Sequence, residues 1–229
     1  MVFSIDYRWS GTADGDARPN EFHELIEDCF GAVLHIQEHA SEYCLDPTRL
    51  AVTGDSAGGH LCTSVSNMIE RVGDGGFGKM SGVYEYKPTY MPSGISVAQA
   101  RESLMAIKAV APNYGVFSAE GIGRFVRNLP EDGRAALAPL DNVPDASVRK
   151  IPHWINKGTK DQVITEESTL DYYNAVKAAG QEVYYIKVEG AEHAYYDWKP
   201  DSATKETFWK YGAPYTREME KFFDTVFYR

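Results

Sequence analysis

The chain has 229 residues, of which 43% are hydrophobic and 24% charged, and its net charge is −10. This length suits one domain with a sizeable core, and the acidity argues against a protein that binds the phosphate backbone of nucleic acids. No apolar run is long enough to span a membrane, and no secretory leader precedes the first apolar run, so we expect a cytoplasmic protein.

Short apolar runs alternate with segments of helical periodicity along the chain. We expect strands at residues 2–7, 49–53, 107–112, 152–156 and 182–188. We expect helices at 20–42, 57–71, 166–179 and 203–227, with short helical pieces near 123–128 and 134–137. This order predicts one α/β domain over 1–229, with a mostly parallel sheet covered by helices on both faces. Glycine and proline interrupt residues 72–100, which predicts a loop or a lid-like insertion there.

The sequence Gly54-Asp55-Ser56-Ala57-Gly58 lies between an expected strand and an expected helix. A G-x-S-x-G pattern in this context is typical of a nucleophile elbow, a turn so tight that glycine is needed two residues on either side of the serine. The turn exposes the Ser56 hydroxyl at the carboxyl edge of the sheet. The Ala57 N–H, at the start of the helix, is then placed to donate to an oxyanion. We expect Asp55 to be structural.

A serine hydroxyl needs a base, and the base needs an orienting group. Among the histidines after Ser56, His60 lies on the elbow helix and His153 inside a strand, so both are expected to be structural. His193 follows the last expected strand, where a base can reach the elbow, and it is the predicted base.

Asp161 follows the strand at 152–156 and is the predicted acid, in the chain order serine, acid, histidine. Asp197 and Glu192 compete with it, but both share the loop of His193. Three aromatic residues near strand ends are candidates to line a substrate pocket, although core packing explains them nearly as well: Tyr114, Trp154 and Tyr195.

No cofactor is indicated. The cysteines, Cys29, Cys44 and Cys62, have neither metal-ligand spacing nor the number that a disulfide framework uses. No Gly-x-Gly-x-x-Gly motif follows a strand, so no dinucleotide site is predicted.

The segment Gly54-Asp55-Ser56-Ala57-Gly58-Gly59-His60 resembles the elbow of α/β-hydrolase carboxylesterases of the hormone-sensitive-lipase type. The runs Asp6-Tyr7-Arg8, Leu45 to Leu50, Gly158 to Asp161 and Glu192-His193 resemble other motifs of that family. The resemblance covers nearly the whole chain. It implies hydrolysis of carboxylic esters with small acyl, aryl or sugar groups.

Two departures from this family stand out. Its members usually continue the Asp-Tyr-Arg motif with Leu-Ala-Pro-Glu, where this chain has Trp9-Ser10-Gly11-Thr12. The His-Gly-Gly loop, which supplies further oxyanion donors in the family, does not occur, and the family's first strands would precede residue 2. The chain therefore looks N-terminally shortened. A truncated sequence, strands supplied by another chain and a rearranged sheet with reduced activity all remain open, as does a homo-oligomer.

The sequence thus predicts a serine esterase that acts on a small-molecule ester, with Ser56 as nucleophile, His193 as base and Asp161 as orienting acid. Two alternatives remain. One is an amide hydrolase, such as an arylformamidase or a peptidase. The other is a binding protein that has kept the α/β-hydrolase fold but lost the oxyanion hole.

Overall fold

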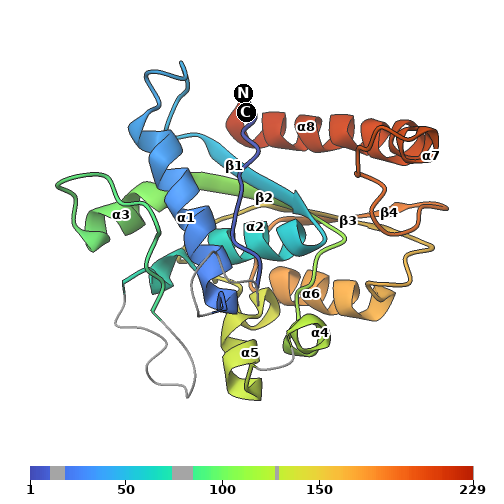
Figure 1. Cartoon of the computed structure of the whole chain (residues 1–229), viewed down its shortest axis with the longest axis horizontal. Helices are drawn as coiled ribbons and strands as arrows, with labels where there is room; N and C mark the ends of the chain where they lie inside the picture. The colour runs from blue at the N-terminus through green and yellow to red at the C-terminus, as the bar shows by residue number, and fades with distance from the viewer. Residues whose placement is uncertain (11–18, 74–84, 127–128, 229) are drawn as a thin grey trace.

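The computed structural model describes residues 1–10, 19–73, 85–126 and 129–228. Within these ranges the strands form one parallel sheet in the order β1-β2-β3-β4, so neighbours in the sheet are also neighbours in the sequence (Figure 1). The strands are β1 (Leu50–Asp55), β2 (Ile107–Asn113), β3 (His153–Gly158) and β4 (Val183–Val188). These four agree with the predicted positions to within two residues.

Helices connect the strands and cover the sheet on both faces. The long ones are α1 (Phe22–Glu38), α2 (Ala57–Asn67), α6 (Glu166–Ala178) and α8 (Ala213–Phe227). The shorter ones are α3 (Val97–Leu104), α4 (Ala119–Phe125), α5 (Glu131–Leu137) and α7 (Ser202–Thr207). Two 3₁₀ turns, Ile69–Arg71 and Pro139–Asn142, and a π-helical turn, Phe208–Gly212, complete the set. On the face opposite α8 lie α1, α2 and α6 (Figure 1).

The two faces have separate cores because side chains alternate along each strand. On β3, Trp154 packs with Phe222 of α8, whereas the next residue, Ile155, packs with Tyr172 of α6. The largest cluster joins α1 and α2 to the sheet around Phe30, Val65 and other fully buried residues. This core fixes α2, and therefore the start of α2, relative to the carboxyl ends of the strands.

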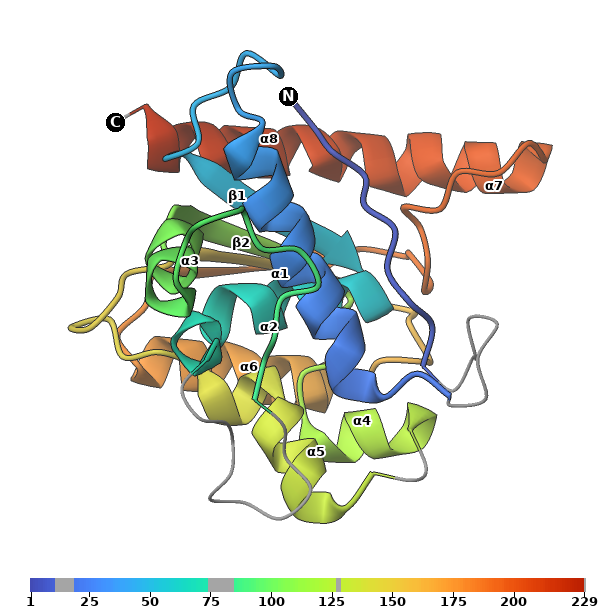
Figure 2. The ribbon, with the colours of Figure 1, turned by 60° about the vertical axis from the view of Figure 1, so that its left-hand side comes forward.

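Residues 2–7 do not form a strand, so that prediction is wrong. The segment runs beside α1 (Figure 2), where Phe3 packs edge-on against Tyr43 with ring centroids 5.0 Å apart. Arg8 anchors its end, because its guanidinium donates to both carboxylate oxygens of Asp28 and to Glu24. A strand needs a neighbouring strand for its backbone groups, and none of the strands in the described ranges pairs with this segment.

The described part of residues 72–100 packs against α1. Tyr86 is fully buried there, Lys87 N–H donates to the Glu27 carboxylate, and Thr89 N–H donates to the Glu27 carbonyl. The segment then enters α3, whose N-cap Ser96 forms a capping box with Gln99. The lid-like part of that prediction falls on residues 74–84, which lie outside the described residues.

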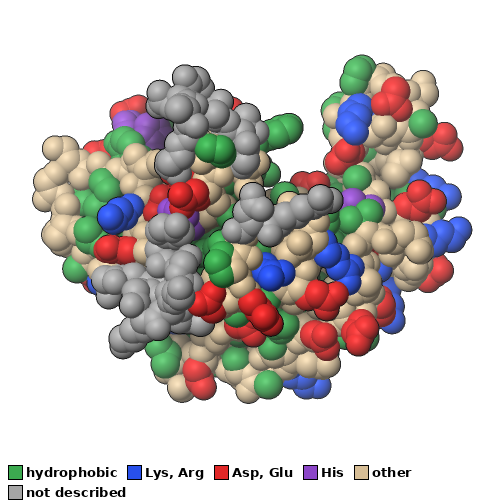
Figure 3. All heavy atoms as spheres, turned by 60° about the horizontal axis from the view of Figure 1, so that its bottom comes forward, with side chains coloured by type: hydrophobic (Ala, Val, Ile, Leu, Met, Phe, Trp, Pro, Cys, Tyr) green, Lys and Arg blue, Asp and Glu red, His purple; other side chains and the backbone are tan. Residues whose placement is uncertain are grey.

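No helix in the described ranges is long and apolar enough to cross a bilayer. On the face shown in Figure 3, acidic and basic side chains are interspersed, and lysines and arginines do not gather into one continuous patch.

Candidate active site

Ser56 lies in a sharp turn between β1 and α2. Its backbone has φ +52° and ψ −111°, a conformation that non-glycine residues rarely adopt. The Ser56 N–H donates to the Asn113 carbonyl at 3.0 Å, which ties the turn to the end of β2. Strain of this kind persists only where the surrounding structure holds it in place.

Glycine is required on one side of this turn but not at the position predicted on the other. A Cβ atom on Gly54 would lie 2.3 Å from the Gly58 carbonyl oxygen, whereas a Cβ atom on Gly58 would meet no atom within 4 Å. The second crowded position is Gly59, where a Cβ atom would lie 2.7 Å from the Cα atom of Gly115. The expectation that Gly58 is sterically necessary is therefore wrong.

The structure brings the three predicted triad residues together. His193 Nε2 lies 2.9 Å from Ser56 Oγ, and His193 Nδ1 lies 2.9 Å from Asp161 Oδ2. An ionised carboxylate only accepts hydrogen bonds, so Nδ1 donates to Asp161 and Nε2 is left to accept the Ser56 proton. Ser56, His193 and Asp161 are thus joined by a continuous chain of hydrogen bonds.

Asp161 is held rigidly in the loop after β3. Its Oδ1 accepts from the N–H groups of Val163 and Ile164 at 2.8 and 3.0 Å, which leaves Oδ2 for His193. The side chain is fully buried. Burial by itself would raise the pKa of Asp161, but the hydrogen bonds from His193, Ile164 and Val163 outweigh it and lower the pKa below its ordinary value. The carboxylate therefore stays charged beside the imidazole.

The three side chains come from loops at the same edge of the sheet. Ser56 follows β1, Asp161 follows β3 and His193 follows β4. In a parallel sheet the carboxyl ends of all strands meet at one edge, which is where open α/β folds place their sites. Ala57 is the first residue of α2, so its N–H has no acceptor inside the helix and is left at the turn.

A small apolar cavity of about 100 Å³ opens beside Ser56. Its walls come from α1, α2, α4 and the residues flanking α4: Phe22, Leu25, Ala57, His60, Leu61, Val116, Ile122, Phe125 and Val126. Burial lowers the pKa of His60 to about 4, so this histidine is neutral at pH 7. Its Nδ1 lies 3.0 Å from the Val116 carbonyl and its Nε2 3.2 Å from Ser64 Oγ. These contacts agree with the predicted structural role of His60, and they leave the cavity without a charged wall.

None of the three aromatic residues predicted for the substrate pocket lines this cavity, which corrects that expectation. Trp154 faces α8 because of the alternation along β3. Tyr195 is fully buried, with its hydroxyl donating to Asn156 Oδ1 at 2.5 Å. Tyr114 is fully buried against the ring of His193. Phe22 and Phe125, which do line the cavity, are not predicted by the sequence, since an apolar helix face is indistinguishable from core when the neighbouring elements are unknown.

His153, the remaining histidine after Ser56, is held by buried hydrogen bonds, as its predicted structural role requires. His153 is fully buried, with Nδ1 2.7 Å from the Ile151 carbonyl and Nε2 3.0 Å from the Tyr172 hydroxyl.

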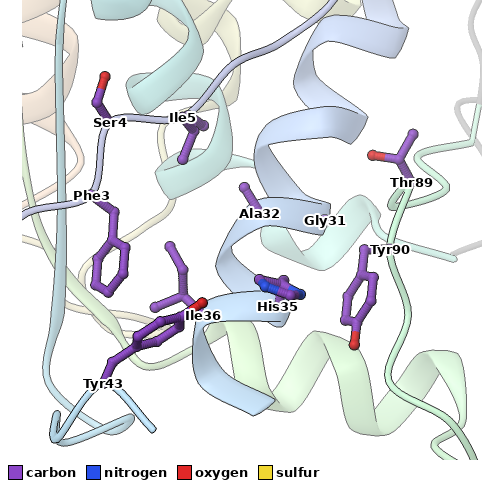
Figure 4. A pocket seen from close by; sticks show the side chains of 10 residues that line it. All are labelled: Phe3, Ser4, Ile5, Gly31, Ala32, His35, Ile36, Tyr43, Thr89 and Tyr90. Carbon is purple, nitrogen blue, oxygen red and sulfur yellow. The ribbon is translucent and has the colours of Figure 1, made fainter. Parts of the chain in front are cut away.

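A larger, open hollow of about 300 Å³ runs along α1, between Phe3 and Tyr43 on one side and Tyr90 on the other (Figure 4). It includes no triad residue. In the described part of the chain, no group of three or more His, Cys, Asp or Glu side chains is placed to hold a metal.

Comparisons with known proteins agree with this architecture. A family model described as alpha/beta hydrolase fold matches residues 1–197. The chain is 34% identical over 73 residues to the carboxylesterase NlhH of Mycobacterium tuberculosis, which covers 32% of this chain and 21% of that protein.

Two solved structures are similar at low sequence identity and therefore bear on the fold. A bifunctional GH43-CE protein of Bacteroides eggerthii aligns with a TM-score of 0.66 at 18% identity, over 91% of this chain and 28% of that one. A thermophilic esterase of Thermogutta terrifontis aligns with a TM-score of 0.57 at 20% identity, over 90% of this chain and 65% of that one. The chain thus spans about a fifth of the curated relative and less than two thirds of each solved chain.

Proposed function

Since the chain belongs to the α/β-hydrolase fold family, we propose that it is a serine hydrolase that cleaves small carboxylic esters. The observation that carries the proposal is the unbroken hydrogen-bond chain from Ser56 Oγ through His193 to Asp161 Oδ2, with both distances at 2.9 Å. The similarity to a carboxylesterase adds support. Activity, substrate and partners of the whole protein all belong to the proposal.

The reaction follows from the positions of these atoms. Ser56 Oγ attacks the acyl carbon while His193 Nε2 takes the hydroxyl proton, and the negative charge forms on the former carbonyl oxygen. The Ala57 N–H donates to that oxyanion. His193 then returns the proton to the departing alkoxide, leaving an acyl group on Ser56. Water attacks the acyl carbon while His193 Nε2 takes a proton from it. The bond between this carbon and Ser56 Oγ then breaks, His193 gives the proton back to Ser56 Oγ, and the carboxylic acid is released. Asp161 keeps its negative charge throughout and stabilises the imidazolium.

The size and apolar lining of the cavity beside Ser56 suit a short, uncharged aliphatic acyl or alkyl group of the ester. Its volume of about 100 Å³ is smaller than the roughly 150 Å³ of an apolar cavity that holds benzene. A charged group would lose its hydration among these apolar side chains without gaining a partner. Acetyl to butyryl esters are therefore the best candidates within the wider class of small acyl, aryl and sugar esters.

Hydrolysis of p-nitrophenyl acetate by the full chain tests this function. We expect turnover that falls at least about 10³-fold in Ser56→Ala, because the other triad members cannot replace the nucleophile. Ser147→Ala, which removes an exposed serine far along the chain, is the matched control and should retain the full rate. Equal rates in wild type and Ser56→Ala would refute the proposal.

A fluorophosphonate probe separates the alternatives. An activated serine reacts with it, so labelling of wild type but not of Ser56→Ala is the expected result. If the folded wild-type protein takes up no label, the non-catalytic binding protein is favoured. If the serine is labelled and p-nitroacetanilide is cleaved faster than p-nitrophenyl acetate, the protein is an amide hydrolase, since the same triad serves both reactions.

A further inference from the structure

Tyr114 has no part in the triad, yet it stands at the centre of the loops that carry it. It is the first residue after β2 and is fully buried. Its φ of +37° is in the left-handed region, which bulky residues avoid. Among the described residues, four non-glycine residues have a positive φ, and three of them are at this edge of the sheet: Ser56, Tyr114 and Ala194. Clustered strain of this kind points to a functional constraint.

Tyr114 contacts each of the loops that bear the triad. Its ring packs against His193 with centroids 4.8 Å apart and an interplanar angle of 61°. Its hydroxyl donates to Asp55 Oδ2 at 3.2 Å, and Asp55 is the residue directly before Ser56. The same hydroxyl accepts from the Tyr196 N–H at 3.3 Å in the base loop. Its own N–H donates to the Asn156 carbonyl at 2.8 Å, on the strand that leads to Asp161.

We propose that Tyr114 is a positioning residue that holds the His193 imidazole in line between Ser56 and Asp161. The ring forms a wall against the imidazole, so His193 cannot rotate toward that side and leave Ser56. The hydroxyl joins the loop of the nucleophile to the loop of the base, so the separation between Ser56 and His193 is set through one buried side chain. This inference rests on the proposed function, because it assigns a task within the same site.

The chemical state of Tyr114 fits this task. Burial, followed by the nearby Asp55 carboxylate, raises the pKa of Tyr114 far above its ordinary value. The hydroxyl therefore keeps its proton and remains a donor to Asp55 over the whole pH range of the activity assay. A phenolate would instead repel Asp55 and open the gap between the two loops.

Two substitutions at this position separate the ring from the hydroxyl. Tyr114→Phe keeps the wall and loses the link to Asp55, whereas Tyr114→Leu removes both. We expect kcat for p-nitrophenyl acetate to fall by roughly 10- to 100-fold in Tyr114→Leu, and at most about fivefold in Tyr114→Phe, since misplacement of a catalytic group lowers the rate of chemistry. KM should change less than about twofold in either variant, because Tyr114 does not line the cavity beside Ser56.

Tyr172→Phe is the matched control. Tyr172 is also fully buried, and its hydroxyl is hydrogen-bonded to His153 and Asn67, away from the triad. Tyr172→Phe should lower the thermal stability of the protein but leave kcat unchanged. If Tyr172→Phe lowers kcat as much as Tyr114→Leu does, or if Tyr114→Leu folds and keeps the wild-type kcat, the positioning role is refuted.

A second measurement does not depend on catalysis. In the folded full chain, the imidazole protons of His193, assigned by comparison with His193→Ala, should show a ring-current shift from Tyr114 in the proton NMR spectrum. The shift should persist in Tyr114→Phe and disappear in Tyr114→Leu. An unchanged His193 spectrum in folded Tyr114→Leu would overturn the inference. A wild-type protein that shows the shift, loses it in Tyr114→Leu and hydrolyses no ester would instead support the positioning and refute the proposed function alone.

Discussion

Gly158 and Ala191 are so close that a Cβ atom on Gly158 would lie 2.3 Å from the Ala191 carbonyl oxygen. Gly158 ends β3 and precedes Asp161, whereas Ala191 precedes His193 in the next loop. The same carbonyl accepts from the Lys160 N–H at 2.9 Å, and the Gly190 N–H donates to Thr159 Oγ1 at 2.9 Å. The distance between Asp161 and His193 is thus set by direct packing between the backbones of the two loops that carry them.

Gly158→Ala should therefore impair catalysis while leaving the core in place. The new methyl group must push the Ala191 carbonyl away, and His193 moves with it. We expect kcat/KM for p-nitrophenyl acetate to fall by roughly 10- to 100-fold, with the far-UV circular dichroism spectrum unchanged. A folded Gly158→Ala protein with activity within twofold of wild type would contradict the steric role of this glycine.

The turn at Ser56 offers a paired test with two glycines. Gly54→Ala places a Cβ atom 2.3 Å from a backbone oxygen, whereas Gly58→Ala places one in open space. We expect Gly54→Ala to lose fluorophosphonate labelling of Ser56 and to unfold at a lower temperature, and Gly58→Ala to match wild type in both. If the two substitutions reduced labelling and unfolding temperature equally, the close contact at Gly54 would not explain why glycine is needed in this turn.

Two buried histidines should make the protein acid-sensitive. Burial lowers the pKa of both His60 and His153 from 6.5 to about 4, so the folded protein excludes a proton that the unfolded chain takes up. The unfolded state binds more protons between pH 6.5 and about 4, so the free energy of unfolding falls as pH drops through this window. The slope is about 1.4 kcal/mol per pH unit for each histidine.

His153→Gln isolates one of these contributions, because His153 is distant from the triad and its neighbours Ile151 and Tyr172 remain. Urea unfolding at several pH values should give a slope that is smaller by about 1.4 kcal/mol per pH unit between pH 6 and 5. Above pH 7 the two slopes should agree, which serves as the internal control. Parallel curves across the whole range would show that His153 takes up a proton in the folded state.

Phe22 should limit the length of the acyl or alkyl group. It lines the cavity beside Ser56, and its ring packs against the neutral His60 with centroids 5.0 Å apart. We expect wild type to prefer p-nitrophenyl acetate and butyrate over octanoate, and Phe22→Ala to shift the preference toward the longer esters by about tenfold in kcat/KM ratio. Phe223→Ala, on the opposite face of the sheet, is the matched control and should keep the wild-type ratio. An unchanged ratio in a folded, active Phe22→Ala variant would contradict this role.

Much of this protein can be predicted from local pattern. Four strands, the long helices and the α/β class follow from alternation and helical periodicity, because each buried element must present apolar side chains at its own spacing. The three residues that form the hydrogen-bonded chain also follow from sequence. Ser56 lies in a strand–turn–helix motif, and His193 and Asp161 follow the last two strands, whose carboxyl ends must lie at the same edge as the elbow.

Other features depend on contacts between segments far apart in the chain, and only the tertiary structure decides them. Residues 2–7 alternate like a strand, but backbone pairing requires a neighbour, and these residues lie along α1. Phe22 and Trp154 look alike as apolar positions, yet one borders the cavity and the other packs under α8. The requirement for glycine at Gly158 comes from a carbonyl 33 residues later, at Ala191. Periodicity determines which side chains are buried, whereas close packing determines what each buried side chain touches, and the second depends on atoms that no local pattern contains.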